Sequence, residues 1–176
     1  MLRGAKLAAG CACVVLQIAV WWRAAVWYPR LPDRYPIHFD ASGTPDGWAS
    51  KSVGTWFLLP LVSLVMTGLM MGLALGGINA MARHTPGLIN IPRKDEFLRL
   101  SPEERVRVLG SMSVFLLMVG AMEGGLFLWL VEGIGRVATG AAQTLSPWAV
   151  FVFVGVVLTG AAVSAVVTVK GIGRRP

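Results

Sequence analysis

Long apolar stretches constrain this chain more than any other feature. Four runs of about 20 residues are each long enough to cross a hydrocarbon core roughly 30 Å thick. The runs are Leu7–Tyr28, Trp56–Ala82, Val106–Val131 and Trp148–Val169. Lipid offers the backbone no hydrogen-bond partner, so such runs have to be helical. With 55% hydrophobic and 14% charged residues, residues 1–176 are predicted to form a single, all-α integral membrane domain.

Basic residues predict how these helices are oriented. Most of the 16 Lys and Arg residues precede the first run, lie between the second and third, or follow the fourth. Positive residues concentrate in cytoplasmic segments, so we expect both termini and the loop 83–105 inside and the loop 28–55 outside. All seven tryptophans then fall near the outer face, as half of an aromatic belt would.

The net charge of +7 follows from the same arrangement. The cytoplasmic segments carry the excess of bases, which also favours anionic lipid headgroups. The charge therefore does not indicate nucleic-acid binding, and the lipid bilayer is the expected partner.

The polar segment Tyr28–Lys51, between the first two runs, is where function is expected. Its 24 residues include several of the ten prolines and one of the two histidines. Turn residues in favoured order predict one turn at Thr44-Pro45-Asp46-Gly47 and another at Asp40-Ala41-Ser42-Gly43. A plain connector needs fewer such residues, so the segment is predicted to be a structured outer loop between the first two membrane helices.

This loop also carries residues of the types that bind divalent metals. His38, Asp40 and Asp46 supply one nitrogen and two carboxylates, which are common metal ligands. Asp is frequent in turns, however, and these side chains can equally bond the loop backbone. We assign no metal, and the three residues stay as weak candidates.

Polar residues inside the apolar runs are few. Glu123 lies well inside the third run, where a charge is costly, so it should face the bundle interior. Arg23, in the outer half of the first run, is the expected partner, with a hydroxyl contact or a proton pathway as alternatives.

Glycines at four-residue spacing allow close helix packing. The second run carries one such stripe and the third another: Gly68, Gly72 and Gly76, then Gly120 and Gly124. They are expected to pack inside the bundle, or else to dock a second copy or another membrane protein.

The cytoplasmic loop contains the start of a helix. Ser101 is followed by Pro102 and, at the third helical position, by Glu104, which is a capping-box pattern. This helix is expected to run straight into the third span. The preceding Asn90–Leu98 mixes charges with apolar residues, so it is predicted to lie at the headgroup level or to dock a partner.

The stretch Leu31–Lys51 resembles a bacterial membrane-domain family of unknown function, found at the N-terminus of Sdp-type toxin immunity proteins. The matching residues are Leu31, Pro32, Pro36, His38, Phe39, Gly43, Pro45, Asp46, Trp48 and Lys51. Asp40 stands where Asn is common in that family. Features that look similar extend over roughly residues 1–130, and the longer immunity proteins carry a further C-terminal module.

The resemblance implies a multi-pass protein of the bacterial inner membrane that acts in immunity or sensing. Its outer loop would then meet a toxin, peptide or envelope signal through His38, Phe39, Asp40, Gly43, Pro45, Asp46, Trp48 and Lys51. No catalytic motif is evident, so we expect neither an enzyme nor a cofactor. An accessory subunit of a larger membrane complex and a small oligomeric transporter or channel remain alternatives.

Overall fold

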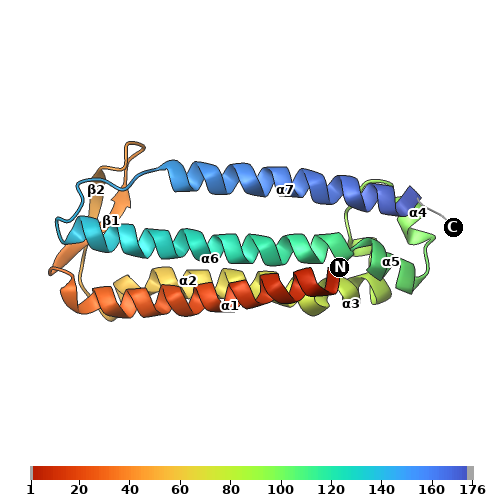
Figure 1. Ribbon diagram of the computed structural model, residues 1–176, viewed down its shortest axis with the longest axis horizontal. Coiled ribbons are helices and arrows are strands. Elements are labelled where there is room, and N and C mark those ends of the chain that lie inside the picture. The colour runs from red at the N-terminus through yellow and green to blue at the C-terminus, as the bar shows by residue number, and fades with distance from the viewer. Residues whose placement is uncertain (1, 174–176) are drawn as a thin grey trace.

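The computed structural model describes residues 2–173 as an elongated bundle of helices with a β-hairpin at one end (Figure 1). Among these residues, four helical spans are long and apolar enough to cross a membrane: Leu2–Arg30, Val53–His84, Gly110–Ala138 and Trp148–Gly173. Each overlaps one predicted run. The helical class of the bundle is confirmed, and these four helices fit a multi-pass membrane protein.

The helices of the bundle are α1 (Leu2–Trp27), α2 (Val53–Gly72), α6 (Gly110–Ala138) and α7 (Trp148–Gly173). A π-helical turn, Leu73–Gly77, joins α2 to α3 (Ile78–His84), so these pieces make one long span. Helix α6 reaches seven residues past the predicted end of its run, to Ala138. This extension brings Glu132 and Ile134 into the bundle.

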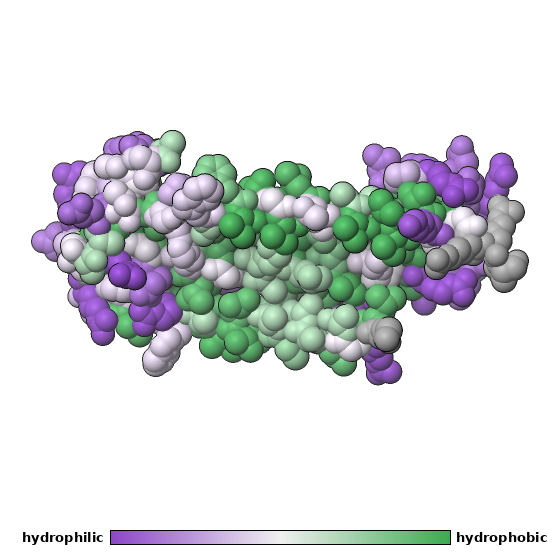
Figure 2. Space-filling model, turned by 45° about the horizontal axis from the view of Figure 1, so that its top comes forward, coloured by the Kyte–Doolittle hydropathy of each residue, from purple (hydrophilic) through white to green (hydrophobic). Residues whose placement is uncertain are grey.

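The two ends of the bundle differ in structure. The hairpin, made of β1 (Arg34–Phe39) and β2 (Pro45–Ser50), lies at one end, and both described chain ends lie at the other. Figure 2 shows apolar residues over the middle of the molecule and hydrophilic residues at both ends. All seven tryptophans belong to the hairpin or to the helix ends nearest to it, as their sequence positions predicted.

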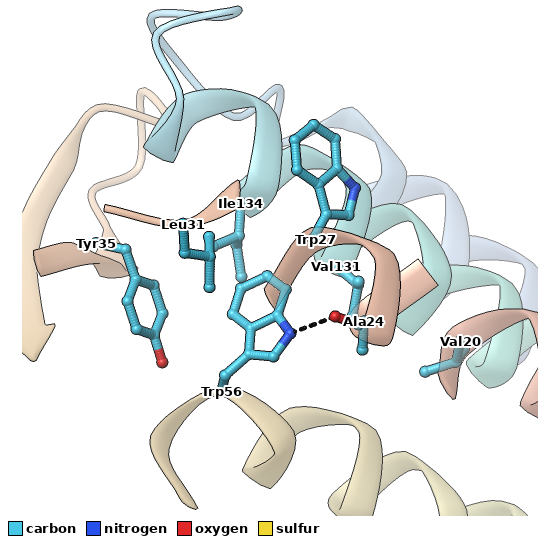
Figure 3. Packing of buried hydrophobic residues seen from close by; sticks show 8 residues of the cluster. All are labelled: Val20, Ala24, Trp27, Leu31, Tyr35, Trp56, Val131 and Ile134. Carbon is cyan, nitrogen blue, oxygen red and sulfur yellow. Dashed lines mark hydrogen bonds between the residues drawn. The ribbon is translucent and has the colours of Figure 1, made fainter. Parts of the chain in front are cut away.

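One stripe of α1 forms the centre of the packing. The buried residues of α1 are spaced three or four apart, which places them on a single face; they are Cys13, Gln17, Val20, Ala24 and Trp27. This face packs most extensively against α6. Near the hairpin it continues into an apolar cluster of eight residues drawn in Figure 3, where Trp56 Nε1 donates to the Ala24 carbonyl at 2.8 Å.

Helix α7 is less buried than the other three spans. It packs mainly against α6, and its buried residues, Ser164, Thr168 and Ile172, all lie in its second half. The first half of α7 therefore presents most of its apolar surface outward, as lipid-facing helices do.

The glycine stripes divide into packed and open ones. A Cβ at Gly120 would lie 3.3 Å from Cys13 Sγ, and one at Gly124 would lie 3.1 Å from Leu16 Cβ, so both admit close contact with α1. Gly68, Gly72 and Gly76 are exposed, with nothing within 4 Å of an added Cβ. The expectation that the stripe on α2 packs inside the bundle is therefore wrong.

The connection at the other end folds back onto the bundle through α4 (Lys94–Leu98) and α5 (Pro102–Val108). Ile91 and Phe97 are buried with residues of α3 and α7. These two side chains are therefore used for packing within the protein, and the position of the segment at the headgroup level stays a prediction. They are shielded because the connection wraps over the helix ends at this end of the bundle.

The helix start at Ser101 is confirmed. Ser101 Oγ accepts from the Glu104 amide at 3.3 Å, and Glu104 Oε2 accepts from the Ser101 amide at 2.8 Å. The straight continuation into the third span is wrong, because α5 ends at Val108 and its C-cap, Leu109, has a φ of −81° and a ψ of 1°, which are not helical. The span begins after this bend, at Gly110.

Candidate functional site

The segment between α1 and α2 is a two-stranded antiparallel hairpin. Strand β1 pairs with β2 from Arg34 opposite Ser50 to Phe39 opposite Pro45, with irregular register around His38. The predicted turn at Asp40–Gly43 is confirmed, because the Gly43 amide donates to the Asp40 carbonyl at 2.9 Å. The predicted turn at Thr44–Gly47 is wrong, since Pro45–Ser50 forms β2.

The Asp40 side chain stabilises the turn by accepting hydrogen bonds. Its Oδ1 accepts from the Ser42 hydroxyl at 2.6 Å, the Ser42 amide at 2.8 Å and the Thr44 amide at 2.9 Å. The Ser42 hydroxyl bond, followed by the Thr44 amide bond, holds the pKa of the Asp40 carboxyl below its usual value. The expectation that an aspartate of this loop bonds its backbone is therefore confirmed for Asp40.

Gly43 joins the turn to a distant part of the chain. Its φ of +83° is in the region that favours glycine, and its carbonyl accepts from the Leu145 amide at 2.8 Å. A Cβ at this position would collide with the Leu145 carbonyl. The hairpin turn is thus docked onto the connection between α6 and α7.

Lys51 closes the base of the hairpin. Its amide donates to the Asp33 carbonyl at 2.7 Å, and its Nζ donates to the Leu31 carbonyl at 2.8 Å. The ammonium group also lies 5.3 Å from the centre of the Tyr28 ring, within cation–π range. These contacts give Lys51 a structural role in the hairpin.

The hairpin presents a group of exposed side chains on its free surface. His38 Nδ1 lies 2.5 Å from Asp46 Oδ1 across the two strands, and Trp48 is about half exposed, at 50%. A Cβ at Gly47 would lie 2.8 Å from His38 Cβ, so the glycine leaves room for the imidazole. Phe39 instead packs against the apolar cluster.

The candidate metal ligands do not converge. His38 and Asp46 meet, while Asp40 is engaged by Ser42 and Thr44. Among residues 2–173, no group of three or more His, Cys, Asp or Glu side chains is arranged to hold a metal ion.

An apolar cavity of about 380 Å³ lies beneath the hairpin. Tyr35, Ile37 and Ala49 line it from the strands, and the first turns of α2 and the last turns of α6 supply the other walls. Tyr35 is 2% exposed, and its hydroxyl has no hydrogen-bond partner among the described residues. The cavity is of the size and lining of small-molecule sites.

A group of hydrogen-bonded polar side chains lies inside the bundle. Gln17 Nε2 donates to Ser63 Oγ and to Thr67 Oγ1, each at 2.7 Å. Thr67 Oγ1 in turn donates to Glu123 Oε2 at 2.5 Å. These four buried side chains, which we call the Gln17 cluster, join α1, α2 and α6.

Arg23 does not hold Glu123, which corrects the expected pairing. The guanidinium donates to Glu132 Oε2 at 2.6 and 2.9 Å, and Trp27 Nε1 donates to the same oxygen at 3.0 Å. The hydroxyl alternative for Glu123 is the one observed. Glu132 was missed because the predicted third run ended one residue before it.

The family comparison covers the hairpin. Residues 15–64 match the model of a domain of unknown function (DUF1648). This segment contains the second half of α1, the whole hairpin and slightly more than half of α2, so the similarity spans less of the chain than the resemblance suggested. The comparison with curated proteins gave no match, and neither did the comparison with solved structures.

Proposed function

We propose that this chain is a non-enzymatic, multi-pass protein of the bacterial inner membrane whose hairpin recognises an extracytoplasmic ligand. The ligand is a toxin peptide or envelope signal, and the protein acts in immunity or sensing. The N- and C-termini lie in the cytoplasm, and the hairpin lies outside. The finer assignment to Sdp-type immunity comes from the residues shared with that family.

A single observation carries the recognition proposal: the hairpin is fixed at its turn and at its base, while its distal side chains stay exposed. The Gly43–Leu145 bond fixes its turn, and Lys51 fixes its base. His38, Asp46 and Trp48 nevertheless remain exposed. A rigid element that presents an aromatic group and paired polar groups suits protein recognition, because little entropy is lost on binding.

Charge and tryptophan placement support the orientation. The connection opposite the hairpin carries bases on α3, α4 and α5, whereas every tryptophan lies toward the hairpin. Positive residues favour the cytoplasmic side. Cysteine accessibility tests this directly: Ser50→Cys should react with a membrane-impermeant thiol reagent in intact cells, and Arg99→Cys should react only after lysis. Both variants need a Cys11→Ser background.

The recognition proposal is tested with the exposed side chains alone. A His38→Ala, Asp46→Ala and Trp48→Ala triple variant should lose protection of cells challenged with an Sdp-type toxin peptide, at unchanged abundance and Tm. Ala41→Ser, on the exposed turn, is the matched control. Full protection by the triple variant contradicts the proposal, as does the absence of protection by the wild-type chain.

The alternative of an accessory subunit has its own observation. The exposed stripe Gly68, Gly72 and Gly76 gives α2 a smooth outer face, which would let a partner helix approach closely. Purification from the native source in mild detergent, followed by mass spectrometry, distinguishes the two proposals. A stoichiometric membrane partner lost in Gly72→Leu favours the subunit, and a protein free of partners favours the sensing role.

A further inference from the structure

The cavity beneath the hairpin has a shape that selects its occupant. Tyr35, Ile37 and Ala49 form a roof across the end of the bundle, and α2 and α6 form the walls. Leu58 and Val62 of α2 lie at the rim and are exposed, at 58% and 40%. An occupant therefore enters from the side of the bundle, along the surface that faces lipid when α2 and α6 cross a bilayer.

The side chains of the lining are apolar except for Tyr35, Thr55 and Trp56, and the Trp56 Nε1 already donates to the Ala24 carbonyl. The Tyr35 ring extends from β1 toward the start of α2 (Figure 3), and its edge contact with Trp56, at 5.4 Å between ring centres, holds it in place. The Tyr35 hydroxyl is buried and has no hydrogen-bond partner among the described residues. Thr55, also in the lining, already bonds the Ser50 carbonyl. Buried hydroxyls normally have partners, so Tyr35 points to a ligand with an acceptor group.

We propose that this cavity binds one acyl chain of a membrane phospholipid, with the lipid's ester carbonyl accepting a hydrogen bond from the Tyr35 hydroxyl. The apolar walls take the chain, and the roof stops it at the level of Trp56, in the first turn of α2. Tryptophans mark the headgroup level of a bilayer, so the ester group arrives beside Tyr35. The proposal needs α2 and α6 to cross a bilayer, and it does not depend on what the hairpin recognises.

Other occupants fit less well. A helix is 10–12 Å across with its side chains, too wide for a roofed space of about 380 Å³. Water is poorly held in a cavity that offers it so few polar partners. An acyl chain matches both the width and the apolar lining.

Two strand positions give a matched pair for the test. Ala49 lines the cavity and stands opposite Tyr35 in the hairpin register, whereas the next residue, Ser50, is exposed. Ala49→Trp should fill the cavity, and Ser50→Trp should add the same bulk on the other face of β2. The probe is phosphatidylglycerol with a photoreactive acyl chain, incorporated into vesicles with the full chain.

Labelling should be saturable and should map to residues of α2 and α6 near the cavity. We expect at least a five-fold reduction in Ala49→Trp and none in Ser50→Trp, with both variants matching the wild type in helix content. Equal labelling of the two variants overturns the proposal. Uniform, unsaturable labelling of all four spans also overturns it, because it shows bulk lipid contact alone.

Tyr35→Phe gives a second test that adds no bulk. Because the hydroxyl has no protein partner, this variant should match the wild-type Tm in lipid-free detergent. Added phosphatidylglycerol should then raise its Tm by less than half as much as in the wild type. Tyr28→Phe, the control, should retain the full increase. A Tyr35→Phe variant with the full lipid-dependent increase contradicts the hydrogen bond, whatever the outcome of toxin challenge.

Discussion

The Leu145 amide donates to the Gly43 carbonyl at 2.8 Å, which ties the connection between α6 and α7 to the turn of a hairpin about 100 residues earlier in the chain. Local sequence around either residue gives no sign of this bond. It makes the two connections at this end of the bundle a single structural unit.

Gly43→Ala should loosen this unit. A left-handed conformation costs a non-glycine residue about 1–2 kcal/mol, and here the new methyl group also meets the Leu145 carbonyl. We expect a lower Tm and faster hydrogen exchange at the Leu145 amide. Gly140→Ala is the control, because Gly140 has a similar φ of +76° but open space around it. Equal effects of the two changes would show that the docking contact contributes little.

Acid should disorder the hairpin turn through Asp40. Hydrogen bonds depress the pKa of this carboxyl in the folded state, so its contribution is complete above the unfolded pKa of about 3.9. That contribution falls as the pH drops through the lower, folded value. The protection factors of the Ser42 and Thr44 amides, which correct hydrogen exchange for the intrinsic effect of pH, should therefore fall between pH 6 and this acid range.

Asp40→Asn is the control for that experiment. The amide oxygen can still accept from the same donors, but the side chain no longer titrates. The variant should keep an ordered turn without the acid-induced loss. An identical acid response in the variant would assign the effect to another group.

The Gln17 cluster should show coupling between helices. Thr67→Val removes the link between Gln17 and Glu123. Glu123→Gln should therefore lower the free energy of unfolding less in the Thr67→Val background than in the wild type. Interhelical hydrogen bonds in membranes average about 0.6 kcal/mol, and reach about 1.7, which sets the expected coupling. Thr159→Val is the control, because the hydrogen bond of the Thr159 hydroxyl lies within its own helix, to the Gly155 carbonyl. The free energy of unfolding in mixed micelles, measured for each single and double variant, gives the coupling.

A separate cycle tests the partner of Arg23. Arg23→Gln and Glu132→Gln should be non-additive, with a coupling of about 1 kcal/mol. Arg23→Gln and Glu123→Gln should be additive, since these side chains belong to different sites. Coupling in the second cycle and not in the first would restore the pairing expected from sequence.

The helices were predictable because apolar length alone specifies them, and the capping pattern at Ser101 is likewise local. The hairpin was not, since Pro36, Pro45 and Gly47 are poor strand residues and irregular register disrupts any alternation. These residues are tolerated because both strands lie at an edge and the bundle supports them from below.

The candidate site was predictable in composition and not in arrangement. His38, Asp46 and Trp48 are exposed on the hairpin, whereas Lys51 and Asp40 are used to build it. The cavity was unforeseeable, because Tyr35, Val62 and Val131 come from three separate elements. The Glu132 contact depended on where α6 ends, which hydropathy locates only to within several residues.

The Gln17 cluster has a consequence for how the protein is made. Gln17, Ser63 and Thr67 all belong to the first two spans, so their hydrogen bonds can form while the rest of the chain is still being synthesised. These bonds would keep the early helical pair together in the membrane until Glu123 arrives on α6 and completes the set. The order of the residues along the chain thus matches an order of assembly, in which α7, the least buried of the four spans, is added last.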